Sequence, residues 1–163
     1  MHVFEKDSNI FMLLSEAVSE GIIVVNQQQQ IVAANQLAHK LFGYELKKLV
    51  GRPLEILIPE THRKVHQKFL QEYFHKHKKR RIGVDRNLFG LKMDGKQFPV
   101  EVSLNHFSLY GKIYTLILLI DITERREIEK SYQMKTAALE AALNGITITD
   151  ALKEDNPIIY FSK

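Results

Sequence analysis

Residues 97–121, with the sequence QFPVEVSLNHFSLYGKIYTLILLID, contain the pattern that decides the fold. In residues 97–106 apolar and polar side chains alternate, which is typical of a strand with one buried face. Gly111 marks a turn, and residues 112–121 predict a second strand whose side chains are nearly all apolar. Because such a strand has to be covered on both faces, we expect the outer face of the sheet to contact an N-terminal helix or a second subunit.

Three more strands are predicted before this hairpin. Residues 22–25 and 31–34 are short apolar runs on either side of the polar stretch 26–30, a pattern that favours an antiparallel hairpin. Residues 82–92 predict a further strand, which an Asp94-Gly95 turn connects to the strand that follows. The expected fold class is therefore α+β, with a five-stranded antiparallel sheet.

Short helices are predicted between the second and third strands, where they cover one face of the sheet. Asn35 is placed to cap a helix that ends at Gly43, and residues 45–50 predict a second short helix. Thr61 is placed to cap a longer helix with an apolar stripe. An amphipathic helix is expected before the sheet, and a charged helix after it.

The pattern near the C-terminus predicts the beginning of a second, similar domain. Residues 139–150 repeat the order found in residues 14–26, namely a helix, a glycine and an alternating strand. The natural gene product is therefore expected to be longer than this chain. The expected segments are an N-terminal amphipathic helix (residues 1–20), the main domain (21–123), a linker helix with a short coiled-coil-like seam (124–144) and the truncated second domain (145–163).

Composition excludes several classes of protein. The chain has 163 residues, of which 45% are hydrophobic and 26% charged, as in ordinary globular proteins. It has no cysteine, which excludes disulfides, thiolate zinc sites and cysteine nucleophiles. The N-terminus lacks a signal peptide pattern, and the longest apolar run is far shorter than a membrane span, so we expect a cytoplasmic location and no membrane insertion. Nucleotide-binding loops and catalytic motifs are also missing, so we do not expect an enzyme.

The net charge of +4 comes from one basic stretch. Residues 63–81 contain eight lysines and arginines and a single acid, Glu72. Such a stretch is usually a solvated helix face. Nucleic-acid binding would require exposed aromatic side chains among the basic ones, and this helix is expected to bury its aromatics, so nucleic acid is not an expected partner.

Taken in order, these motifs resemble the PAS family of sensory domains. The opening hairpin, the Leu41-Phe42-Gly43-Tyr44 stretch and the Met93-Asp94-Gly95-Lys96 turn each match the family pattern at the expected place. Asp121-Ile122-Thr123 resembles the motif that joins the last PAS strand to a signalling helix. The resemblance covers about residues 10–125. It implies a cavity between the sheet and the helices, and a signalling role for Asp121, Ile122 and Thr123.

Within this family, residues 58–86 resemble the FixL-type haem-PAS oxygen sensors without a gap. That resemblance implies His66 as the axial ligand of haem iron and Arg86 as the residue that hydrogen-bonds bound oxygen. Arg81 departs from the pattern, since the haem sensors have an apolar residue there. The residues expected to contact a cofactor or ligand are His66, Arg86, Leu70, Tyr73, Ile82, Val102 and Leu104.

Alternatives to haem stay open at this point. An empty pocket or one that holds a small metabolite is favoured over haem, because buried histidines are usually only hydrogen-bonded. His62 and His66 are one helical turn apart and could chelate a metal, but no carboxylate completes that set.

The expected function is that of a sensory and dimerisation module, with a downstream PAS domain and an output such as a histidine kinase or a cyclic-dinucleotide enzyme in the same longer chain. The expected partners are a second copy and a small-molecule ligand. The alternative is a ligand-free PAS scaffold that only dimerises.

Overall fold

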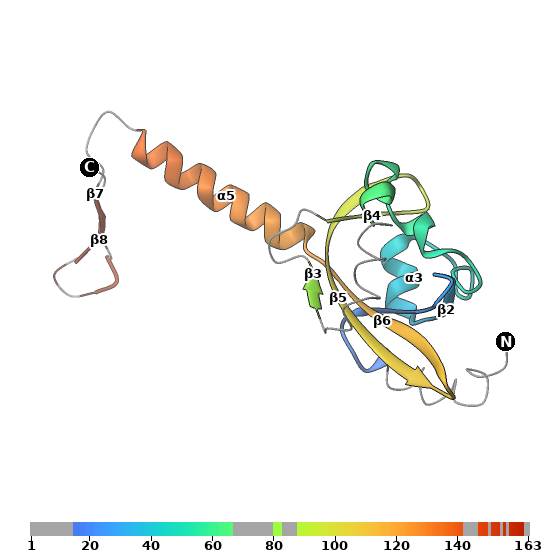
Figure 1. Cartoon of the computed structure of the whole chain (residues 1–163). Helices are drawn as coiled ribbons and strands as arrows, with labels where there is room; N and C mark the ends of the chain where they lie inside the picture. Colours follow the sequence, from blue (N-terminus) through green and yellow to red (C-terminus); the bar gives the residue numbers. More distant parts are fainter. Residues whose placement is uncertain are drawn as a thin grey trace. The chain divides into compact units, whose positions relative to one another are not determined.

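The computed structural model describes residues 15–66, 80–82, 88–141, 147–149, 151–153, 155 and 157–161; for residues 80–82 only the backbone is described. The chain divides into two units, Met1–Thr123 and Glu124–Lys163 (Figure 1). Most of the predicted N-terminal helix lies outside the described residues. Of its last residues, which are described, 15 and 16 are helical. No helix in the described part of the chain is long and apolar enough to cross a membrane.

The first unit is built on an antiparallel sheet in the strand order β2-β1-β6-β5-β3. Both β3 and β4 pair with β5, β3 opposite residues 102–104 and β4 opposite residues 97–99, so the sheet is five strands wide. This confirms the predicted five-stranded antiparallel sheet. The strands are β1 (Gly21–Asn26), β2 (Ile31–Ala34), β3 (Arg80–Ile82), β4 (Phe89–Leu91), β5 (Gln97–Leu109) and β6 (Lys112–Asp121).

The long β5–β6 hairpin supports the rest of the sheet. Its strands pair from Val100 opposite Asp121 to Leu109 opposite Lys112, so β5 continues three residues past the predicted end at His106. Gly111 has a φ of 73°, the left-handed conformation that a tight turn requires of one residue and that glycine adopts without strain. On its other edge β6 pairs with β1, which makes β6 the central strand of the sheet.

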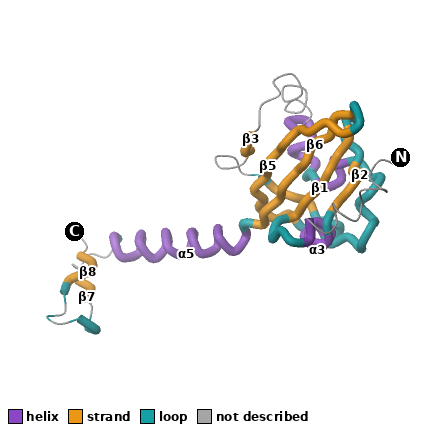
Figure 2. Tube along the Cα trace, turned by 90° about the horizontal axis from the view of Figure 1, so that it is seen from below, coloured by secondary structure: helices purple, strands orange, loops and turns teal. Residues whose placement is uncertain are grey.

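Helix α3 (Gln36–Phe42) covers one face of the sheet and contacts β1 (Figure 2). Its predicted ends are confirmed, because the Asn35 side chain accepts a hydrogen bond from the backbone N–H of Ala38 and Gly43 is left-handed with a φ of 72°. The 3₁₀ helix η1 (Leu54–Leu57) follows, and residues 60–66 are helical.

Two of the helix predictions are wrong. Residues 45–50 form turns instead of a helix, because Lys47 has a φ of 67° and its N–H donates to His39 Nε2 at 3.3 Å, which breaks the helical path. Thr61 lies inside the helix, not at its cap, and its hydroxyl bonds the ring of His62. A tertiary contact and a local side-chain bond thus override the sequence signals.

Apolar side chains are buried on both faces of the sheet. The larger cluster, which includes Ile23, Phe42 and Ile117, lies on the face covered by α3 and η1. A smaller cluster on the other face contains Val24, Ala33 and Tyr114, and Tyr114 stacks on Phe107 with ring centroids 5.6 Å apart. On β6, Ile117 is buried on the first face and Tyr114 on the second, whereas Leu116, Leu118 and Ile120 are half-buried. The expected contact of the outer face with an N-terminal helix or a second subunit stays a prediction.

The second unit contains helix α5 (Thr123–Glu140) and a hairpin of β7 (Thr147–Thr149) and β8 (Ile158–Phe161). No residue of α5 is buried in this chain, and Ile128, Tyr132 and Met134 are exposed on it. The order here is a helix followed by a strand hairpin, and the expectation that residues 145–163 begin a second domain stays a prediction.

One buried side chain, Asn35, connects several segments of the first unit. Its Oδ1 accepts from the N–H groups of Ile22 and Ala38, each at 2.9 Å. Its Nδ2 donates to the carbonyls of Ser15 at 3.0 Å and Glu20 at 2.9 Å. All the bonding capacity of this amide is used inside the protein, where an unpaired polar group would be costly.

We predict that Asn35→Ala destabilises the protein by about 3 kcal/mol, because it removes a helix cap and leaves buried backbone groups unpaired. The measurement is the free energy of unfolding in urea. The matched control is Asn26→Ala, since the Asn26 side chain also accepts from two N–H groups but lies in an exposed turn; it should cost about 1 kcal/mol or less. Equal losses in the two variants would contradict the central role given to Asn35.

Candidate ligand-binding site

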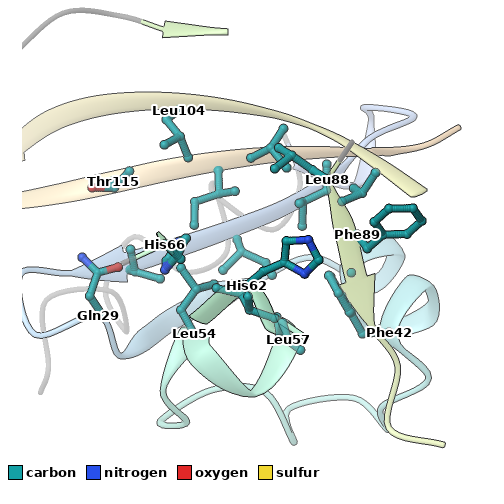
Figure 3. A pocket seen from close by; sticks show the side chains of 18 of the residues that line it. Gln29, Phe42, Leu54, Leu57, His62, His66, Leu88, Phe89, Leu104 and Thr115 are labelled. Carbon is teal, nitrogen blue, oxygen red and sulfur yellow. The ribbon is translucent and has the colours of Figure 1, made fainter. Parts of the chain in front are cut away.

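A cavity of about 170 Å³ lies between the sheet and the helices that cover it (Figure 3). Its walls come from β1, β4, β5 and β6 on one side and from α3, η1 and the helix of residues 60–66 on the other. The sheet side is formed mainly by Ile23, Val25, Val100, Val102, Leu104, Ile117 and Leu119, and the helical side by Phe42, Leu54 and Leu57. Almost all of the lining is therefore apolar.

Tight packing closes the cavity where β4 passes Phe42. A Cβ atom added to Gly90 would lie only 2.6 Å from the ring of Phe98 and 3.0 Å from that of Phe42. The two rings meet edge to face with centroids 5.3 Å apart. Only a glycine lets β4 come this close to both rings.

His66, the predicted ligand-binding histidine, lines the cavity and is half-buried. Burial lowers the pKa of His66 below its ordinary value of 6.5, and the carboxylate of Glu55 opposes this effect only in part. The imidazole is therefore neutral at pH 7. A neutral imidazole on an apolar wall can accept a hydrogen bond or donate an electron pair to a metal.

Of the other predicted contact residues, two line the cavity, one is described only by its backbone, and three are not described. Val102 and Leu104 lie on the cavity wall. Ile82 is in β3, and its backbone is opposite Val102. Leu70, Tyr73 and Arg86 lie outside the described residues, as does the side chain of Arg81.

His62 also lines the cavity, one helical turn before His66. Its Nδ1 is 2.9 Å from the hydroxyl of Thr61, and its ring centroid is 6.4 Å from that of Phe89. Within the described part of the chain no three histidine, aspartate or glutamate side chains come together as a metal site. His62 and His66 therefore line the cavity as a pair, with Glu55 close enough to His66 to influence its pKa.

Sequence reasoning missed two polar residues at the cavity, Gln29 and Thr115. The sequence places Gln29 only in a turn, and nothing in the polar run 26–30 indicates which side chain points inward. Thr115 carries a weak signal, because it is the polar member on the inward-facing positions of β6. Its hydroxyl lies 2.9 Å from His106 Nδ1.

The predicted signalling residues lie at the end of β6. Asp121 Oδ1 accepts from the N–H of Thr123 at 2.9 Å, which caps the first turn of α5. The N–H of Ile122 donates to the carbonyl of Pro99 at 3.1 Å, so this junction is also attached to the beginning of β5. Asp121 therefore caps α5, and its predicted signalling role stays a prediction.

The site fits haem in its chemistry but not in its size. His66 provides a neutral nitrogen donor in apolar surroundings, which is what an axial ligand requires. Pockets that hold drug-sized ligands have volumes of roughly 300–1,000 Å³, whereas this cavity measures about 170 Å³. A porphyrin is too large for it, so haem binding would require the wall to move outward.

Comparisons with known proteins agree with the fold. Residues 11–122 match the family described as the PAS fold. The oxygen sensor protein DosP of Escherichia coli is 29% identical over 126 residues, which are 77% of this chain and 16% of DosP. The sensor protein FixL of Bradyrhizobium diazoefficiens is 26% identical over 116 residues, which are 71% of this chain and 23% of FixL.

A solved structure, the PAS domain of a two-component sensor histidine kinase, is similar with a TM-score of 0.59 at 14% identity, over 72% of this chain and 97% of that domain. This likeness concerns the fold alone. The chain spans less than a quarter of the length of either relative, at 16% of DosP and 23% of FixL. With most of its length matched, the chain belongs to the PAS family, whose domains are sensory modules of signal-transduction proteins such as histidine kinases.

Proposed function

We propose that this chain is the ligand-binding module of a longer signalling protein and relays the state of its cavity through β6 to α5. The observation that supports this is the course of β6. Thr115, Ile117 and Leu119 line the cavity, and the same strand continues to Asp121, which caps α5. A ligand that contacts these side chains therefore acts on the strand that leads to the signalling helix.

The relay requires two arrangements of the junction at residues 121–123. In one, the Asp121 cap and the bond from Ile122 to Pro99 are both made. A ligand that binds better to a second arrangement of β6 shifts the population toward it, and the beginning of α5 moves as a consequence. The reaction that α5 controls belongs to an output domain in the longer cytoplasmic protein, because a PAS domain is itself non-catalytic.

A small apolar probe tests the binding function. An apolar cavity of about 150 Å³ is large enough for benzene, and this one is slightly larger. At ten times its Kd, benzene should stabilise the native state by about 1.4 kcal/mol, which raises the Tm by ~5 °C. Val102→Phe, which fills the cavity, should abolish the rise. A Tm that benzene leaves unchanged in the wild type would favour the ligand-free scaffold.

Haem-based sensing is a second candidate, favoured by the neutral His66 on the cavity wall and by the similarity to the oxygen sensor DosP. We predict that added hemin gives a sharp Soret band with the wild type and not with His66→Ala. His62→Ala is the matched control, because His62 lines the same cavity one turn away, and it should keep the band. A band that survives in His66→Ala, or no band at all, would exclude this candidate.

The pH dependence of hemin binding provides a further control. A neutral imidazole binds iron and a protonated one does not. Because the pKa of His66 is lowered, its neutral form persists below pH 6.5, and affinity should hold from pH 8 to about 6.5 and fall only in more acidic buffer. Affinity that rises with acidity would contradict ligation by His66.

We further propose that the module forms a homodimer through the outer face of the sheet, with downstream PAS and output domains following in the same chain. Side chains on this face of β6, such as Leu116, Leu118 and Ile120, are only half-buried, whereas Ile117 and Leu119 on the inner face are buried. An apolar strip at the centre of a sheet is a suitable contact between two copies.

We predict that Leu118→Lys weakens self-association at least tenfold, because it places a charge in the centre of the contact. Sedimentation equilibrium over a range of concentrations measures the effect. Lys112→Glu, at the exposed tip of the same hairpin, is the control and should leave the dimer unchanged. If both variants associate like the wild type, the dimer does not use this face.

A further inference from the structure

The cavity has one polar feature that its apolar lining does not explain, the side-chain amide of Gln29. Both Nε2 and Oε1 are buried, and neither has a hydrogen-bond partner among the residues that the structure describes. An amide buried in this way loses its bonds to water and gains none in return. A buried polar group without a partner calls for an explanation, and a molecule bound in the cavity is one that would complete its bonding.

The position of Gln29 is fixed from both sides. Its N–H donates to the carbonyl of Asn26 at 3.0 Å, and its own carbonyl accepts from the N–H of Leu54 at 2.9 Å. The residue has a φ of 60°, a left-handed conformation that is uncommon for a side chain of this kind. These bonds hold Gln29 in the β1–β2 turn, next to the first residue of η1, and its amide faces the cavity (Figure 3).

The amide lies at the polar end of the cavity. In Figure 3, Gln29 is on the same side as His66 and Thr115, whereas Phe42 and Phe89 are on the opposite side. The hydroxyl of Thr115 is bonded to His106 and keeps unused hydrogen-bonding capacity. The rest of the described lining is apolar apart from the two histidines, His62 and His66.

We propose that Gln29 is the recognition residue for a neutral ligand that has an apolar body of about the size of one ring and a carboxamide or lactam group. This inference rests on the proposed binding function and names its ligand class. An amide edge offers a donor and an acceptor side by side, which matches the free Oε1 and Nε2 of Gln29. The ligand is neutral because the lining described contains no Asp, Glu, Lys or Arg to pair with a charge.

The size of the cavity limits the body of the ligand. A volume of about 170 Å³ compares with the roughly 150 Å³ that accommodates benzene. Benzamide has a single ring and a primary carboxamide, so it is the probe that combines both features, and benzene is the probe that lacks the polar group.

The experiment compares the Kd of benzamide and of benzene for the wild type and Gln29→Leu by calorimetric titration. Leucine has a similar shape and no amide, so benzamide should bind at least tenfold more weakly, while benzene binds as well or better. Gln28→Leu is the matched control, since Gln28 is the exposed neighbour in the same turn, and it should change neither Kd.

Each outcome decides the inference. If Gln29→Leu binds benzamide as tightly as the wild type does, the inference is wrong, although benzene binding would still support the proposed function. If neither benzamide nor benzene binds the wild type, both the inference about Gln29 and the proposed binding function are wrong. If Gln29→Leu does not fold, Gln29→Asn replaces it, because asparagine keeps the amide but withdraws it by one methylene. Benzamide should then bind at least threefold more weakly than to the wild type. An unchanged Kd for benzamide would overturn the inference.

Discussion

The hydrogen bonds of Asn35 are the constraint on which the site depends. They join β1 through Ile22, α3 through Ala38, and the segment before β1 through Ser15 and Glu20. Apolar packing alone would let a strand slip by two residues while keeping its buried face, whereas a buried amide with four partners fits only one register. Because that register is fixed, the next residue along β1, Ile23, points into the cavity.

The central strand β6 connects the cavity wall directly to the beginning of α5. Hydrogen bonds to β1 and β5 hold it along both edges, so it moves with its neighbours or not at all. Its inner side chains line the cavity, and its last residue caps α5. The proposed relay from the cavity to α5 therefore needs only one covalent segment, and no chain of separate contacts across the domain.

The sequence was sufficient to predict the parts of the fold that local pattern controls. Alternation identified β5, and Gly43 and Gly111 have the positive φ values expected of a helix end and a turn. The missed features depend on contacts between distant segments. Residues 45–50 turn because His39 accepts from Lys47, and Gln29 faces the cavity because Asn26 and Leu54 hold its backbone. Neither contact produces a repeating pattern of apolar and polar residues, since each is a single hydrogen bond between residues that are not neighbours in the sequence.

The two ligand classes under test make opposite demands on the same wall of the cavity. A single-ring amide fits the space as it is and uses Gln29, so binding should leave the helix of residues 60–66 where it lies. Haem exceeds this volume, and His66, the residue that would hold it, belongs to that helix, so the cavity would accept haem only if the helix lay farther from β5 and β6. A ligand of the first class would contact the β1–β2 turn through Gln29 and β6 through its lining side chains, whereas His66 lies on the helical wall opposite the sheet. The residue that a ligand engages thus determines which side of the cavity begins the signal.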